Sequence, residues 1–194
     1  MKARVFAILV ALLAMSAARA DAPVTTDSIY QLEAHLTNQS GIVHGLDVYR
    51  GRPVLVTMFY SGCQMTCPLL IDTLRALEHA VPPRQRTNLR ILMISIDPAH
   101  DTPAALQGVV TQRRLDTTAW TLARAEERDV RKIAALLNVQ YRALPSGGYN
   151  HSSIVTLLDS AGEIVVQSNV LGRADERLVT AIGNTADRAR IATP

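Results

Sequence analysis

Cysteine is scarce in this sequence, because the 194 residues include only two, Cys63 and Cys67. A chain held together by disulfides needs several pairs, and small exported domains of that kind are dense in cysteine. The chain is long enough for one domain with a hydrophobic core of its own. A disulfide scaffold is therefore excluded, and this single close pair is expected to have a special role.

Long apolar segments are also missing, apart from one near the start. Two basic residues precede an apolar run at 6–17, and the small-residue stretch AARA follows it. This order is typical of a secretory signal peptide, and the run is short for a membrane span. We expect residues 1–20 to be a signal peptide and residues 21–194 to form a single exported domain, located in the periplasm. An uncleaved leader that anchors the chain to the inner membrane is the alternative.

An excess of positive charge is missing once the leader is set aside. The leader holds three of the 20 basic side chains and no acidic one, which leaves 17 basic against 17 acidic side chains. A nucleic-acid-binding domain needs a basic face or stripe. The charge balance therefore gives no support for a nucleic-acid partner.

Repeats, low-complexity runs and linkers are absent too, and the chain alternates between strand and helix patterns. Continuous apolar runs predict buried strands, and apolar residues at helical spacing predict amphipathic helices. Strands are predicted at 52–60 and 89–97, and helices from the cysteines to Pro82, over 101–115, over 126–139 and over 174–182. Hairpins are predicted at 152–169, with its turn near Gly162, and around 40–48. This order predicts an α/β fold: a thioredoxin-like domain whose central mixed sheet is flanked by helices, with an N-terminal hairpin extension.

The motif FYSGCQMTCP places the cysteine pair between a predicted strand and a predicted helix. The unpaired N–H groups and the dipole of a helix start stabilise a thiolate, so they are expected to lower the pKa of the thiols. Cysteines four residues apart bring their sulfur atoms to one side of the first turn. The spacing fits a redox couple and equally fits two ligands of one metal ion.

Two thiolates are an incomplete site for most metals, so a third ligand is needed. Zinc requires three or four ligands, whereas Cu(I) accepts two or three and prefers soft sulfur. The surroundings of His35, His79 and His100 are those of surface residues, and His44 lies in the N-terminal hairpin. His151 follows a Gly-rich loop that, in a thioredoxin-like fold, lies beside the helix carrying the cysteines. It is the best-placed candidate for the third ligand.

Three segments in register, FYSGCQMTCP, SIDPAHDTP and NHSSIVTLLDSAGEI, resemble the SCO family of copper chaperones. The resemblance spans roughly residues 40–185 and implies a thioredoxin-like fold that binds one copper ion per chain, as Cu(I) or Cu(II). By position it implies Cys63, Cys67 and His151 as the metal ligands. It also implies that Asp97 lies near the metal without binding it.

The resemblance further implies a function and partners. Members of the family help to assemble the copper centre of cytochrome c oxidase, by delivering copper or by reducing the cysteines of the receiving subunit. The implied partners are the copper-receiving subunit of a terminal oxidase and a copper-donor chaperone or a thioredoxin-like reductant. Contact with the membrane is expected only through the partner or an uncleaved leader.

Three features near the motifs have ordinary explanations. Met65 offers a soft thioether, but a side chain filling a surface gap is the preferred interpretation. Either Thr102 or Asp101 can cap a helix that begins at Pro103, so Asp101 is interpreted as a cap rather than a site residue. The SGG stretch at 146–148 either makes the His151 loop mobile or forms an ordinary turn.

Two enzymatic functions stay open beside the metallochaperone. A thiol–disulfide oxidoreductase would use Cys63 and Cys67 as a couple to reduce partner cysteines. Such enzymes usually have two residues between the cysteines, where this chain has three, and a cis-proline where this chain has NHSS. A peroxidase would use Cys63 with Ser61 or Thr66, but the sequence places no arginine beside them.

Overall fold

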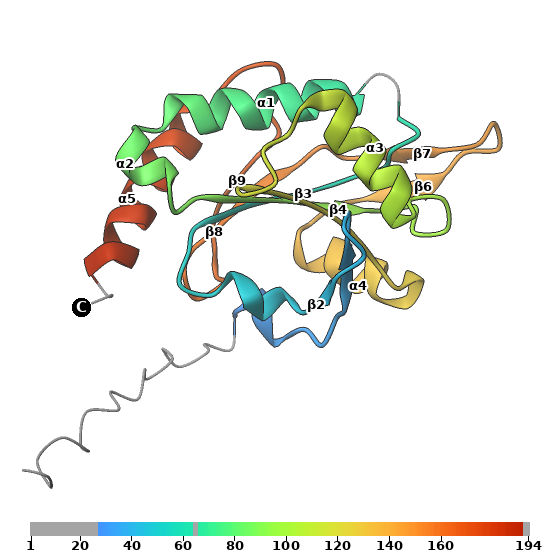
Figure 1. Ribbon diagram of the computed structural model, residues 1–194, viewed down its shortest axis with the longest axis horizontal. Helices are drawn as coiled ribbons and strands as arrows, with labels where there is room; N and C mark the ends of the chain where they lie inside the picture. Colours follow the sequence, from blue (N-terminus) through green and yellow to red (C-terminus); the bar gives the residue numbers. More distant parts are fainter. Residues whose placement is uncertain (1–26, 64–65, 192–194) are drawn as a thin grey trace, which may run out of the picture.

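The computed structural model describes residues 27–63 and 66–191, and these form a sheet with helices on both faces (Figure 1). Four short elements come first, two 3-10 helices and two strands, and are followed by five α-helices and the remaining strands. The 3-10 helices are η1 (Ile29–Gln31) and η2 (Leu46–Tyr49). The α-helices are α1 (Thr66–Ala80), α2 (Pro83–Arg86), α3 (Pro103–Arg113), α4 (Glu127–Leu136) and α5 (Glu176–Ile191). The strands are β1 (Leu36–Asn38), β2 (Val43–His44), β3 (Val54–Phe59), β4 (Arg90–Ser95), β5 (Trp120–Ala125), β6 (Tyr141–Ala143), β7 (Tyr149–His151), β8 (Val155–Leu158) and β9 (Ile164–Ser168).

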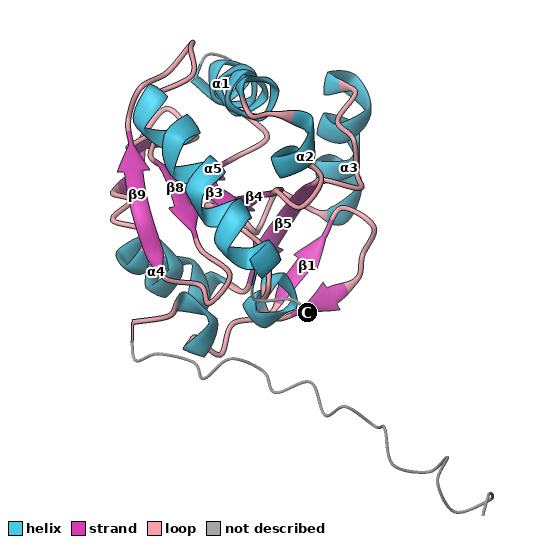
Figure 2. Cartoon of the chain, turned by 90° about the vertical axis from the view of Figure 1, so that its left-hand side faces the viewer, coloured by secondary structure: helices cyan, strands magenta, loops and turns pink. Residues whose placement is uncertain are grey.

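Seven strands form one mixed sheet in the order β2-β1-β5-β4-β3-β8-β9. The three central strands β5, β4 and β3 run parallel, and β1 and β8 pair antiparallel to them on the two sides. Figure 2 shows the sheet with α5 lying across the β8 and β9 side. The predicted α/β class and mixed sheet are confirmed. The β6–β7 hairpin forms a separate two-stranded sheet and projects from the body in Figure 1.

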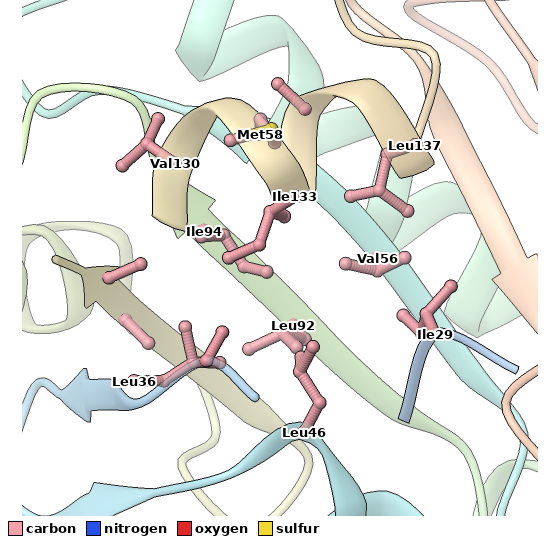
Figure 3. Close-up of a cluster of buried hydrophobic side chains, with 14 of the residues drawn as sticks. Ile29, Leu36, Leu46, Val56, Met58, Leu92, Ile94, Val130, Ile133 and Leu137 are labelled. Carbon is pink, nitrogen blue, oxygen red and sulfur yellow. The ribbon is translucent and has the colours of Figure 1, made fainter. Parts of the chain in front are cut away.

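Alternate residues of β3 and β4 enter two different cores, which explains why their sequences are almost entirely apolar. Val56 and Leu92 face the core formed with α4 and the N-terminal segment, shown in Figure 3. Leu55 and Ile91 face the core formed with α1, α3 and α5. A strand buried on both faces has no polar side to display.

Several sequence predictions need correction in detail. The N-terminal hairpin exists as β1–β2, but it is joined to the main sheet because β1 pairs with β5. Strand β5 itself was not predicted, since its sequence WTLARA mixes Ala and Arg with apolar residues and has no continuous apolar run. The last helix continues to Ile191, well beyond the expected end near Ile182. The hairpin at Gly162 is confirmed, with φ +85° at that glycine.

Candidate metal centre

Both cysteines lie at the carboxyl end of β3, where the chain turns into α1. The backbone N–H of Cys63 donates to the Tyr60 carbonyl at 3.2 Å, and the N–H of Cys67 donates to the Cys63 sulfur at 3.3 Å. The carboxyl ends of parallel strands are the usual place for a site in an α/β sheet. The predicted placement of the pair between a strand and a helix is therefore confirmed.

The two thiols differ in their surroundings. Cys67 is 5% exposed and belongs to the core under α1, whereas Cys63 is half-buried. Burial raises the pKa of the Cys67 thiol, and the hydrogen bond and charge of Cys63 raise it further. The expectation that the helix start lowers this pKa is wrong for Cys67, because removing a thiolate from water costs more than a helix start restores.

His151 is the last residue of β7 and reaches the cysteines from the other side of the site. One ligand atom of His151 and the two cysteine sulfur atoms all lie within 4.8 Å of one another. No other group of three His, Cys, Asp or Glu side chains within 27–63 and 66–191 meets the same criterion. The structure thus brings together the three residues that the sequence singled out.

The imidazole of His151 is arranged to offer one nitrogen lone pair. Its Nδ1 lies 3.2 Å from the Ser152 carbonyl, which accepts only from a protonated nitrogen, so the tautomer leaves Nε2 without a proton. Nε2 is buried and has no hydrogen-bond partner among the described residues. Burial lowers the pKa of His151, which favours the neutral ring. A buried lone pair beside two thiols suits a soft metal ion that prefers sulfur and imidazole.

Asp97 lies in the loop after β4 and forms a pair with His100 rather than with the three grouped residues. His100 Nδ1 lies 2.8 Å from Asp97 Oδ1, and the His100 side chain is 82% exposed. This pairing raises the pKa of His100 through the hydrogen bond to Asp97. The interpretation of His100 as a surface residue agrees with its exposure. The role of Asp97 near the metal stays a prediction.

Asp101 is a scaffold residue: of the two residues predicted as possible caps of α3, Thr102 is confirmed and Asp101 is wrong. Thr102 caps α3 instead, since its hydroxyl accepts from the Ala105 N–H at 3.2 Å. The Asp101 carboxylate is 1% exposed and accepts from the Ser61 N–H and from the hydroxyls of Ser61 and Ser95. It thereby ties the loop that leads into the cysteines to the end of β4.

The two glycines before His151 are required by the backbone of a tight turn. Gly147 and Gly148 have φ values of +87° and +74°, which residues with a Cβ rarely adopt. Leu144 closes the turn through hydrogen bonds with both of them. The SGG stretch therefore forms an ordered turn, and the mobility of the His151 loop stays a prediction.

Two sequence predictions lie outside the described residues: the signal peptide at 1–20 and the role of Met65. Across 27–63 and 66–191, no helix has the length and apolar character needed to cross a bilayer.

The fold and the grouped side chains define a class of protein: a thioredoxin-like domain with two cysteines and one histidine gathered at the start of α1. The sequence profile of the SCO1/SenC family matches residues 25–187. The chain therefore belongs to the SCO1/SenC family, and the resemblance noted from its motifs is confirmed.

Relatives of known structure share the fold. A SCO1/SenC family lipoprotein from Bacillus anthracis superposes with a TM-score of 0.71 at 21% identity, over 80% of this chain and 94% of that one. Arabidopsis thaliana ScoI, whose structure was solved with copper bound, superposes with a TM-score of 0.67 at 15% identity. The match covers 79% of this chain and 96% of that one. A protein of Stutzerimonas stutzeri described as copper-binding is 29% identical over 87 residues, which cover 45% of this chain and 42% of that protein. The matched region thus spans less than half of that relative.

Proposed function

We propose that this protein binds one copper ion through the sulfur atoms of Cys63 and Cys67 and the Nε2 atom of His151. The observation that carries the proposal is the buried, unpartnered Nε2 within a group whose ligand atoms lie within 4.8 Å. Buried polar atoms normally have partners, so one without any beside two thiols marks a position for an electrophile. The copper-bound relative of the same fold supports the choice of metal.

The donor set also supports a particular oxidation state. Two thiolates and one imidazole satisfy Cu(I), whereas Cu(II) prefers more nitrogen and oxygen ligands and would add water or a nearby group. Binding requires the buried Cys67 thiol to lose its proton, and the charge of the metal ion replaces that proton in the site. Copper is cargo in this proposal, since a carrier must bind it and later release it.

The cellular role that best fits the family is assembly of the copper centre of a terminal oxidase. We propose that the protein is exported to the periplasm, receives copper from a donor chaperone, and gives it to the copper-receiving oxidase subunit. The family membership and the leader-like start of the sequence support this role. Cell fractionation tests the location. A deletion strain tests the role: it should lose oxidase activity, and wild type should restore that activity whereas Cys63→Ser should not.

The binding proposal is tested by titrating the purified, reduced protein with Cu(I) against a chromophoric chelator. Wild type should bind one Cu(I) per chain, and His151→Ala should lower the affinity by at least about tenfold, because loss of even a hydrogen-bond partner of a metal ligand costs roughly 10- to 100-fold. His100→Ala is the matched control, because it removes an imidazole that pairs with Asp97 outside the group. Equal affinity of wild type and His151→Ala would refute the three-ligand site.

One observation favours thiol–disulfide exchange as a second function. The Cys67 N–H donates to the Cys63 sulfur, and a hydrogen bond of this kind stabilises a Cys63 thiolate as the attacking group. Cys63 is also the more exposed of the two thiols, so a partner disulfide reaches it first. In that reaction the Cys63 thiolate attacks one sulfur of the partner disulfide, which releases the other sulfur as a thiolate and leaves a mixed disulfide. Cys67 then attacks Cys63 in the mixed disulfide and releases the second partner thiol, so the partner ends as a dithiol and the chain as the oxidised disulfide. A His151→Ala protein that keeps full reductase activity would separate this function from copper binding.

A further inference from the structure

Tyr60 is the residue that contacts both halves of the candidate metal centre. It follows β3 directly, and its carbonyl accepts from the Cys63 N–H at 3.2 Å. Its hydroxyl donates to the Tyr149 carbonyl at 3.3 Å, in the strand that ends at His151. Its ring meets the His151 ring edge-on, with 5.9 Å between centroids and 74° between planes.

The turn of the β6–β7 hairpin is shaped around the Tyr60 phenol. A Cβ added at Gly148 would lie 3.0 Å from the Tyr60 hydroxyl oxygen, which is tighter than ordinary contacts. At Gly147, by contrast, a Cβ would have no atom within 4 Å. Gly148 therefore leaves space for the hydroxyl beneath the turn, in addition to supplying its positive φ.

The hairpin needs such a contact because it belongs to its own two-stranded sheet. Its strands pair only with each other among the described elements, and an isolated two-stranded hairpin is marginally stable in water. Tyr141 and Tyr149 pack against the core on the α4 side, which holds the base of the hairpin to the body. Tyr60 is the link from the hairpin to the cysteine loop.

We propose that Tyr60 is a positioning residue that holds the β6–β7 hairpin, and with it His151, against the loop of Cys63 and Cys67. The inference rests on the proposed three-ligand copper site for its effect on binding. Its effect on the hairpin is independent of any metal. Tyr60 acts through His151, so its contribution to copper binding disappears when His151 is absent.

A double-mutant cycle tests this dependence. Tyr60→Phe removes only the hydroxyl and should weaken Cu(I) binding roughly threefold, as loss of one long neutral hydrogen bond does. Tyr60→Leu also removes the edge-on ring contact and should weaken binding on the order of tenfold. In the His151→Ala background both changes should stay within about twofold. Tyr141→Phe is the matched control, because Tyr141 lies opposite His151 in the same hairpin and its hydroxyl has no hydrogen bond to Tyr60 or to the cysteine loop among the described residues.

Hydrogen exchange of the metal-free protein gives a readout that does not depend on copper. Tyr60→Phe should speed exchange of the β6–β7 amides severalfold, while β3 and β4 keep wild-type protection. Gly148→Ala should also speed exchange of the β6–β7 amides, and Gly147→Ala should speed it less. Both variants carry the cost of a positive φ, but only the Cβ at position 148 displaces the Tyr60 phenol. Tyr60→Phe preserves the packing of the ring, so it decides the question even where a glycine variant fails to fold.

The outcomes separate the two proposals. Unchanged hairpin exchange in Tyr60→Phe, or affinity losses that persist in the His151→Ala background, would overturn the role of Tyr60. Equal Cu(I) affinity in wild type and His151→Ala would overturn the copper site instead, and faster hairpin exchange in Tyr60→Phe would still support the positioning role.

Discussion

His151 and Asp101 are both polar side chains withdrawn from water near the cysteines, and their hydrogen bonding differs completely. Both oxygens of Asp101 accept hydrogen bonds, from Ser61 and from Ser95. His151 uses Nδ1 toward the Ser152 carbonyl and leaves Nε2 without a partner among the described residues. A fully satisfied buried group stabilises the scaffold, whereas an unsatisfied one beside thiols is available for chemistry.

Replacing Asp101 should destabilise the fold more than replacing the cap next to it. Asp101→Ala leaves the Ser61 N–H and two hydroxyls without their acceptor, so we expect a loss of about 2–4 kcal/mol in the free energy of unfolding. Thr102→Ala removes the α3 cap and should cost about 1 kcal/mol. Urea unfolding of both variants measures the difference. Equal losses would show that Asp101 contributes no more than a cap.

At the level of elements, three helices begin with different acceptors for their first N–H groups. The Thr102 hydroxyl serves α3, and the Asp175 carboxylate serves α5 through the Arg177 N–H at 2.9 Å. In α1 the acceptor is the sulfur of Cys63, three residues before the helix, which accepts from the Cys67 N–H. The acceptor at the start of α1 is therefore also a candidate metal ligand, so the helix start and the site share one atom.

The start of α5 makes stability depend on pH in a predictable direction. The hydrogen bonds from Ser168 and from the Arg177 N–H lower the pKa of Asp175 below its ordinary value of 3.8. A lowered folded-state pKa stabilises the fold above the unfolded-state pKa, and this contribution is lost as pH falls through the folded-state value. Because Asn replaces a charged acceptor by a neutral one, Asp175→Asn should cost about 1 kcal/mol at pH 7, and the gap to wild type should shrink below about pH 4.

Denaturant unfolding at pH 7 and near pH 3 measures this change. Glu176→Gln is the control, since it removes an exposed charge at the next position and should cost only about 0.3 kcal/mol. A gap between Asp175→Asn and wild type that stays constant with pH would contradict the role given to the carboxylate.

At the scale of the whole molecule, the sheet separates two cores and the site lies at one end of it. The core of Figure 3 joins the N-terminal segment to α4, and the second core joins α1, α3 and α5 to the opposite face. The candidate ligands come from two segments, the start of α1 and the end of β7. A metal ion bound by both would link the projecting hairpin to the body of the domain.

Copper should therefore stabilise the folded protein. With free Cu(I) at about 100 times Kd, the expected gain is about 2.7 kcal/mol, or a rise in Tm of roughly 5–10 °C for a domain of this size. Scanning calorimetry under reducing conditions measures it. His100→Ala should show the full rise and His151→Ala a smaller one, whereas an unchanged Tm in wild type with copper would contradict the proposed site.

Local patterns in the sequence were sufficient for much of the fold. Strands β3 and β4 are almost entirely apolar, Thr102 and Pro103 mark the start of α3, and Gly162 marks a hairpin turn. Strand β5 is not predicted from the sequence, because its residues show no strand pattern of their own and are buried only by their neighbours in the sheet. The sequence does not distinguish the cap Thr102 from the buried acceptor Asp101, because both roles place a polar residue at the same helix start.

The sequence by itself determined the thioredoxin-like order of elements, the position of the cysteine pair at a helix start and, through its motifs, the family. Those features depend on residues close together in the chain, where spacing and propensity act directly. Only the tertiary structure decided which thiol is buried, that Nε2 of His151 lacks a partner, and that Tyr60 reaches beneath Gly148. These depend on the packing of segments distant in sequence, and burial and hydrogen bonding are set by that packing.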